Sequence, residues 1–138
     1  MHFRSPILNP RFTPDAKKVL QNLTNRVSAE LASNPALAAT VLSRRQIIAA
    51  TFSRKVAIAS YGRAVEGLVA DSIARNPMLS SMFRHVGLRP NSPDFIGLGM
   101  YQRLMFDITT LQRAAAHLSR PYGNGLHLIF YMRPPTFP

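Results

Sequence analysis

The sequence contains neither cysteine nor tryptophan, and only six of its 138 residues are acidic. The lack of cysteine excludes a disulfide framework and a thiolate metal site. The lack of tryptophan removes the side chain most enriched at interface hot spots. Charged residues interrupt every apolar stretch, so no run approaches the ~20 residues that a bilayer-spanning helix needs. The hydrophobic content of 46% nevertheless supports a core, and the length predicts a single domain.

The chain is strongly basic, with 17 Lys and Arg residues and a formal net charge of +11. Only Lys17, Lys18 and Lys55 are lysines, so arginine dominates the basic residues. Arginine is the cation favoured in phosphate contacts and buried ion pairs. The balance predicts an acidic partner, which could be nucleic acid, anionic lipid headgroups or the acidic face of a neighbouring subunit. An arginine-biased genome is the alternative explanation.

Helical signals dominate the first half. Residues 1–12 are predicted to form an extended arm, and Thr13-Pro14-Asp15 a helix start with a hydroxyl N-cap and proline in the first turn. Asn34-Pro35 should end this helix and cap the next one, because proline disfavours helical geometry in the residue before it. Ser43 and Gln46 suggest a capping box within a helical pattern that extends to about Arg75. The first helix has an apolar stripe at Val19, Leu20, Leu23, Val27 and Leu31.

The second half also favours helices. Asn76-Pro77 predicts another break, and residues 78–88 a short helix closed by Gly87 and Pro90. Ser92-Pro93-Asp94 predicts the start of a last long helix, and residues 121–125 a turn-rich break. The segment 126–132 is short, apolar and β-prone, so a strand or an extended segment is expected there. The stripe of the last helix comprises Leu104, Ile108, Leu111, Ala115 and Leu118.

These signals predict an all-α protein, a compact bundle of about four helices. The helical domain would span residues 13–120. The extended arm, residues 1–12, would precede it, and a proline-rich extended tail, residues 121–138, would follow it. Aromatic residues on the apolar stripes are expected in the core rather than on a base-stacking platform. They are Phe52, Tyr61, Phe83, Tyr101 and Phe106.

No catalytic constellation is evident in the sequence. The four histidines do not pair with other ligand types at helical spacing, and no glycine-rich phosphate loop or nucleophile elbow occurs. The acids lie on separate predicted helices: Glu66 and Asp71 do not share a face, and Asp107 has no partner on its own helix. Each is therefore expected to be a cap or an arginine partner. We predict no catalytic, metal or cofactor site.

The most patterned stretch runs from Tyr61 to Val86. It is predicted to be one helix, a break at Asn76-Pro77 and a second helix that ends in a basic pair. An aromatic residue and a basic residue precede Gly-Leu, an acid follows, and a further Tyr-x-Arg occurs later. The positions are Tyr61, Arg63, Gly67-Leu68, Asp71, Arg84-His85-Val86, and Tyr101 with Arg103.

This pattern resembles the small matrix-side helical subunit of the mitochondrial cytochrome bc1 complex, also called subunit 7 or the ubiquinol-binding protein. The match covers about half of the chain. His85 stands where that family usually has arginine followed soon by proline, and the family's tryptophan and its acidic, lysine-rich tail are missing. The first residues, with Arg4, Arg11 and no acid, have the composition of a mitochondrial targeting segment.

The resemblance implies a non-catalytic accessory subunit of ubiquinol-cytochrome c reductase, complex III. It would lie peripherally on the matrix side of the mitochondrial inner membrane and would support assembly. Its partners would be cytochrome b, the core subunits and anionic lipid headgroups, with no cofactor and no small-molecule substrate. The residues predicted to contact protein or lipid are Arg44, Arg45, Arg63, Arg84, His85 and Arg103.

Two alternatives remain open. A mitochondrial ribosomal protein would use the same arginines on rRNA phosphates, although their spread over every predicted helix makes nucleic acid the weaker prediction. The other alternative is a small enzyme or toxin domain, for which His117 and Asp107 are the residues to mutate.

Overall fold

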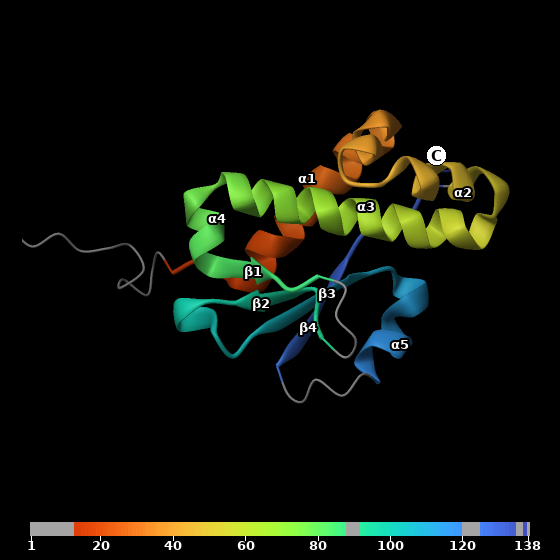
Figure 1. Ribbon diagram of the computed structural model, residues 1–138. Helices are drawn as coiled ribbons and strands as arrows, with labels where there is room; N and C mark the ends of the chain where they lie inside the picture. The colour runs from red at the N-terminus through yellow and green to blue at the C-terminus, as the bar shows by residue number, and fades with distance from the viewer. Residues whose placement is uncertain (1–12, 88–91, 120–124, 135–136, 138) are drawn as a thin grey trace, which may run out of the picture.

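The computed structural model describes residues 13–87, 92–119, 125–134 and 137. Helices fill the first part of the chain, and a four-stranded sheet follows (Figure 1). The predicted all-α class is therefore wrong, and the protein is mixed α/β. The predicted arm, residues 1–12, lies outside the described residues.

Two long helices form the helical layer. Helix α1 spans Ala16–Ser33, and α3 spans Arg54–Arg75. Both bury one stripe of apolar side chains at helical spacing, as predicted for α1 from its sequence. The N-cap of α1 is Asp15, whose carboxylate accepts a hydrogen bond from the Lys18 amide at 3.1 Å, rather than the predicted Thr13. Asn34 ends α1 as predicted.

The chain between α1 and α3 forms two short helices, where the sequence predicted one helical pattern that extends to about Arg75. Pro35–Thr40 forms the 3₁₀ helix η3, and α2 spans Arg44–Phe52. The predicted capping box is confirmed: the Ser43 side chain accepts from the Gln46 amide, and the Gln46 side chain accepts from the Ser43 amide. A second cap at Ser53 then starts α3. Helices α2 and α3 thus form a hairpin (Figure 1).

The sheet begins where the sequence predicts a helix. Helix α4 is only Pro77–Met82, and Phe83–His85 continues directly as strand β1. Strand β2 is Phe95–Gly97, so Ser92-Pro93-Asp94 precedes a strand and does not start a helix. The predicted basic end of a helix, Arg84-His85, therefore lies on a strand.

The predicted last long helix is replaced by a strand and a short crossover. Strand β3 spans Met105–Thr109, and a single turn, η4 (Gly99–Tyr101), joins it to β2. The crossover comprises η5 (Leu111–Arg113) and α5 (Ala114–Leu118). Of the strand and the extended segment left open for 126–132, the structure has the strand, β4 (Leu126–Phe130). Leu111 and Leu118 of the predicted stripe are 74% and 64% exposed. They do not share a helix face with Leu104 and Ile108, because β3 ends at Thr109 and the chain continues as η5 and α5.

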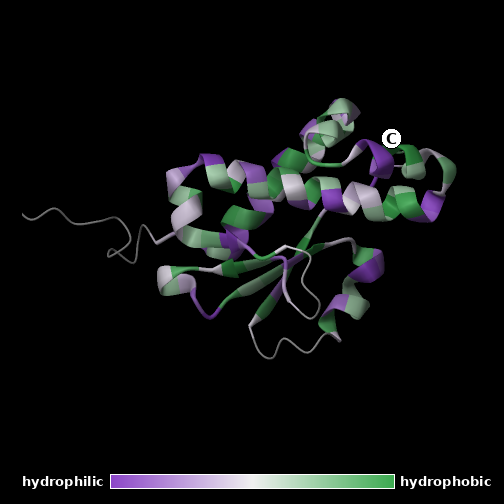
Figure 2. Ribbon diagram, viewed as in Figure 1, coloured by the Kyte–Doolittle hydropathy of each residue, from purple (hydrophilic) through white to green (hydrophobic). Residues whose placement is uncertain are grey.

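The sheet has the order β1-β2-β3-β4, with β1, β2 and β3 antiparallel and β4 parallel to β3. Helices α1 and α3 cover one face, and α5 packs against β3 and β4 on the side away from α3 (Figure 1). The strands are mostly apolar where they lie beneath the helices (Figure 2). The shared core joins both layers through Leu20, Tyr61, Val65, Phe83, Phe95, Phe106 and Ile129.

Candidate functional site

Three acidic residues from three separate elements meet where α3 crosses the sheet. Glu66 comes from α3, Asp94 directly precedes β2, and Asp107 lies within β3. The Asp94 amide donates to Oδ1 of Asp107 at 3.0 Å, and the Asp94 carboxyl group also hydrogen-bonds to the Glu66 side chain. We call Glu66, Asp94 and Asp107 the acidic cluster.

The strand register brings two of these acids together. Phe95 pairs with Phe106 across β2 and β3, so Asp94 and Asp107 occupy the next positions along the same ladder. Oδ2 of Asp94 accepts a hydrogen bond from the Ile108 amide at 2.8 Å, which fixes its side chain against β3. Asp107 is 0% exposed. Because the pairing joins residues 13 positions apart, helical spacing could not reveal it.

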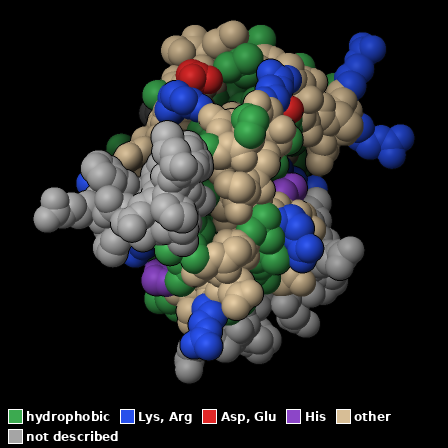
Figure 3. Space-filling view, turned by 90° about the vertical axis from the view of Figure 1, so that its left-hand side faces the viewer, with side chains coloured by type: hydrophobic (Ala, Val, Ile, Leu, Met, Phe, Trp, Pro, Cys, Tyr) green, Lys and Arg blue, Asp and Glu red, His purple; other side chains and the backbone are tan. Residues whose placement is uncertain are grey.

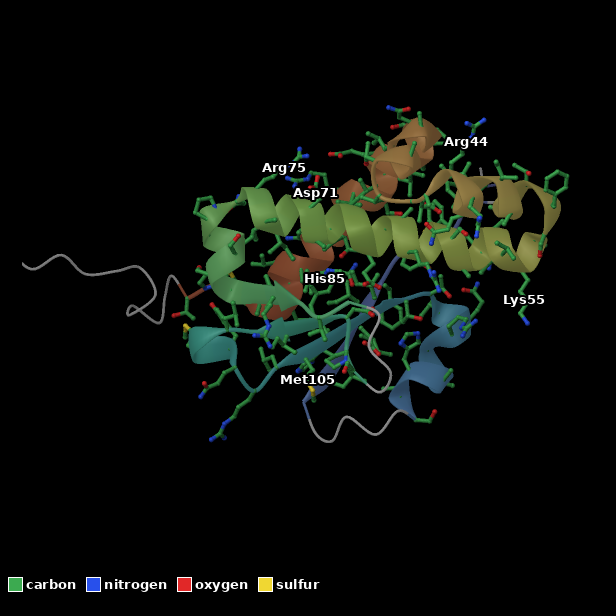
Figure 4. The ribbon with its side chains drawn as sticks, in the orientation of Figure 1. Arg44, Lys55, Asp71, Arg75, His85 and Met105 are labelled. Carbon is green, nitrogen blue, oxygen red and sulfur yellow. The ribbon has the colours of Figure 1, made fainter. Side chains whose placement is uncertain are left out.

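A histidine flanks the cluster on each side. Nε2 of His85 on β1 lies 2.7 Å from Oε2 of Glu66, and Figure 4 shows His85 between α3 and the sheet. Nδ1 of the buried His117 on α5 lies 2.9 Å from Oδ2 of Asp107. This contact uses one ring nitrogen of His117, and Nε2 is the other. The two histidines and three acids therefore form one connected polar network.

The surroundings of Asp94 favour its neutral form. Burial, together with the negative charge of Glu66, raises the pKa of Asp94 from 3.8 to about 8, and Asp107 adds to the effect. The hydrogen bond from the Ile108 amide acts in the opposite direction but does not offset these effects. The raised pKa favours a protonated carboxyl group at Asp94 within the cluster.

Other acids of the chain serve as the caps and arginine partners that the sequence predicts. Asp15 caps α1, and Asp71 pairs with Arg75 at 3.0 Å on the side of α3 away from the sheet (Figure 4). Glu66 lies on the opposite side of α3, toward the sheet. Half of the six acids of this basic chain thus gather in one partly buried site.

No group of three or more His, Asp or Glu side chains among the described residues is arranged to hold a metal ion. A closed metal cage is thus not present in that part of the chain. Mg²⁺, however, is commonly bound by one or two carboxylates and completes its shell with water and substrate phosphate oxygens. Asp107 is fully buried and both of its carboxylate oxygens already accept hydrogen bonds, so Asp94 and Glu66 are the two carboxylates of the cluster that such a shell could use.

A pocket of about 390 Å³ lies between α2 and α3. Three cations line it: Arg45, Lys55 and Arg63. Its floor is apolar, formed in part by Val56 and Ala59. We call it the basic pocket. It brings together two of the arginines predicted to contact partners, Arg45 and Arg63.

The other predicted contact residues do not meet. Arg44 starts α2 and lies away from Lys55 in Figure 4, and Arg84 and Arg103 are exposed on β1 and before β3. On the face that Figure 3 shows, lysine and arginine side chains are likewise dispersed over the surface. His85 is placed by its contact with Glu66 in the acidic cluster.

The sequence prediction missed the residues of the acidic cluster as a site. A signal existed in Phe106-Asp107-Ile108-Thr109, where aromatic and β-branched residues alternate around one acid. A strand here places Asp107 on the face opposite to Phe106 and Ile108, but the strand pattern does not say which residue lies across from it. The helical stripe through Leu104 and Ile108 outweighed that signal.

Comparison of the chain with protein-family models, curated proteins and solved structures finds no match. Among the described residues, no helix combines the length and the apolar character needed to span a membrane. The site geometry therefore carries the functional argument by itself.

Proposed function

We propose that the protein is a divalent-metal-dependent phosphodiesterase that cleaves nucleic acid. The convergence of Glu66, Asp94 and Asp107 from α3, β2 and β3 carries this proposal. Carboxylates held together against their mutual repulsion are costly unless they serve a cation or a proton transfer. Their position at the junction of a helix and a sheet, beside cations, suits an anionic substrate.

The chemistry follows from the carboxylate oxygens. Asp94 and Glu66 would hold Mg²⁺ or Mn²⁺, whose remaining positions would take water and a phosphate oxygen, while the buried Asp107 holds the backbone of Asp94 in place. A bound ion would polarise the phosphoryl group and lower the pKa of its water. That water would lose a proton and form the new bond to phosphorus while the bond to the leaving oxygen breaks, and the leaving oxygen would take a proton from solvent water.

The histidines act through the carboxylates. His117 holds Oδ2 of the buried Asp107 at 2.9 Å, which fixes the orientation of that carboxylate in the same way as a hydrogen-bonded partner orients a metal ligand. His85 does the same for Glu66 at 2.7 Å. Both are therefore positioning residues in this proposal, and neither needs to contact the substrate.

The charge of the chain supports nucleic acid as the substrate. A net charge of +11 favours association with a polyanion over a neutral or cationic substrate. The basic pocket supplies cations on the same helix that carries Glu66. A nucleic-acid backbone suits both sites, because it presents a cleavable phosphodiester to the acidic cluster and flanking negative charges to the basic pocket.

The test is a cleavage assay on the purified protein with labelled single- and double-stranded DNA and RNA. We expect cleavage of at least one of these substrates with Mg²⁺ or Mn²⁺ and none with EDTA. Asp94→Asn keeps the shape of the side chain but removes its charge, and should lower the rate by at least about 100-fold. Asp71→Asn is the matched control, because Asp71 lies on α3, as Glu66 does, but pairs with Arg75 outside the cluster.

A binding measurement makes this test independent of substrate choice. Mn²⁺ should raise the melting temperature of the wild type and of Asp71→Asn, but not that of Asp94→Asn. The proposal is wrong if no substrate is cleaved and Mn²⁺ does not stabilise the wild type. It is also wrong if Asp94→Asn cleaves as fast as the wild type.

The accessory-subunit function implied by the family resemblance stays a prediction. The resemblance implied an all-helical fold, and the sheet corrects that part. Purification of the native protein followed by mass spectrometry of its partners would test it. Co-purification with cytochrome b would support the accessory subunit and count against a free nuclease.

A further inference from the structure

We propose that the basic pocket between α2 and α3 binds the phosphate backbone of a nucleic-acid strand, a few nucleotides from the bond that is cleaved. This inference rests on the proposed function and extends it to the way the substrate is held. It predicts one particular path of the strand, along α3, with the acidic cluster at one end and Lys55 at the other.

The geometry of α3 connects the pocket to the acidic cluster. Val56, Ala59, Arg63 and Glu66 are spaced by three, four and three residues, so they lie along one side of the helix. Arg63 is less than one turn from Glu66. Lys55 lies about three turns before Glu66, roughly 16 Å along the axis at 1.5 Å per residue. The pocket and Glu66 thus lie along the same helix, with Arg63 as the pocket residue nearest in sequence to the cluster.

The charges of the pocket are available to a ligand. Arg45, Lys55 and Arg63 are all exposed, and no ion pair between them and an acid occurs within the described part of the chain. No acid lines the pocket. Three cations around a hollow attract a polyanion, and the distance from Lys55 to Glu66 matches a strand of several nucleotides at ~3.4 Å per nucleotide.

The apolar floor agrees with the same ligand. Val56 and Ala59 lie between the cations, where the sugar and base face of a strand could rest while its phosphates meet the rim. A compact inorganic anion would need no such floor, so a strand fits better than an isolated phosphate.

The experiment measures binding without cleavage. Fluorescence anisotropy with a labelled 12-nucleotide single-stranded DNA, in EDTA, compares two triple variants that lose the same charge. The pocket variant is Arg45→Gln, Lys55→Gln and Arg63→Gln, and the control is Lys17→Gln, Arg84→Gln and Arg103→Gln, all at exposed positions outside the pocket. We expect the pocket variant to bind at least about 10-fold more weakly and its salt slope to fall by ~0.7 per lost contact.

A second measurement separates this inference from the proposed function. Bis(p-nitrophenyl) phosphate has a phosphodiester but no flanking phosphates, so the pocket variant should hydrolyse it as the wild type does. On the oligonucleotide its KM should rise with little change in kcat. Equal loss of affinity in both triple variants, or no loss in the pocket variant, overturns the inference even if cleavage is observed. Failure of all cleavage with a selective loss of binding overturns the proposed function and leaves the pocket assignment standing.

Discussion

The helical layer and the sheet layer of this protein are stabilised by contacts of different range. In residues 16–82, each α-helix begins after a residue whose side chain caps it, and the apolar stripes repeat at three and four residues. In residues 83–130, the strands are three to five residues long, and each depends on a partner from elsewhere in the chain. The acidic cluster lies where the two layers meet.

The difference bears on function as well as folding. Local contacts build rigid helices and leave their polar side chains on the surface. Pairing between strands instead brings together acids that are distant in sequence, such as Asp94 and Asp107, and buries them. The sheet layer can therefore hold a charged group that a helix surface would leave to solvent.

The largest loss of stability is expected from truncating side chains in the core that both layers share. Phe106 of β3 and Leu20 of α1 are both 0% exposed. Phe106→Ala should cost about 3–5 kcal/mol and Leu20→Ala about 2–5 kcal/mol, through lost burial and the cavity left behind. Because one core joins the layers, each variant should unfold in a single transition. Urea unfolding followed by far-UV circular dichroism and by tyrosine fluorescence would check this.

Two separate transitions in Phe106→Ala, with the helical signal surviving, would contradict a shared core. The helical layer would then be a unit of its own, and the sheet an addition to it. Ile48→Ala serves as a control, because this residue of α2 is half exposed and should change the stability little.

The next largest effect is expected at Gly97 of β2. A Cβ at this position would collide with the carbonyl oxygen of Tyr101, because the chain turns back tightly through η4. Gly97→Ala must therefore displace backbone, which should cost about 1–3 kcal/mol. Thermal unfolding of the purified variant measures the loss. A melting temperature equal to that of the wild type would show that the turn can shift freely.

How much of this fold the sequence could predict follows from the range of the contacts. The Ser43 capping box and the end of α1 at Asn34 depend on residues within one turn, and both predictions are confirmed. For 126–132, the β-prone composition and the turn residues before it left a strand or an extended segment open, and the structure has strand β4 there. Phe52, predicted for the core, is exposed because α2 packs with its other side on α3.

The sheet and the site were not predictable by the same means. Strands of three residues carry too little alternation to compete with a helical stripe, and Leu104 and Ile108 happen to fit one. Local spacing does not contain the strand register. It therefore could not predict that residue 97 must lack a side chain, or that Asp94 pairs with Asp107. The arginines of the basic pocket were predicted to contact partners, but their grouping came only with the α2–α3 hairpin.

A smaller effect is expected from neutralising Asp94. Its pKa is about 8 in the folded state and 3.8 in the unfolded reference, so folding takes up a proton between these values. Stability should therefore fall as the pH rises from about 4 to 8, and this loss is absent in Asp94→Asn. Asp94 is partly exposed and coupled to Glu66. We therefore expect Asp94→Asn to raise the free energy of unfolding at pH 8 by only about 1–2 kcal/mol.

Urea unfolding of Asp94→Asn and the wild type at pH 5 and pH 8, both in EDTA, gives this difference directly. The gain should be larger at pH 8 than at pH 5. A variant that is less stable than the wild type at pH 8 would show that the ionised Asp94 stabilises the fold. The same variant is expected to lose cleavage, so stability and activity should change in opposite directions.

The smallest effect is expected within the helical layer, at two junctions that look alike in sequence. Asn76-Pro77 and Asn34-Pro35 each join two helical segments. The Asn76 side chain accepts hydrogen bonds from the Met78 and Leu79 amides at 3.0 and 3.2 Å, whereas Asn34 makes no side-chain cap bond. Asn76→Ala should therefore cost about 1 kcal/mol, and Asn34→Ala, its matched control, less than about 0.5 kcal/mol.

Chemical unfolding of both variants would separate the two junctions. A cap at Asn76 also sets the direction in which α4 leads into β1, so its loss should loosen the edge of the sheet before the helices. Hydrogen exchange should then rise at the β1 amides, such as that of His85, while the α1 amides keep their protection. Equal costs at Asn34 and Asn76 would mean that the proline, present in both junctions, and not the cap bond, fixes the helix start.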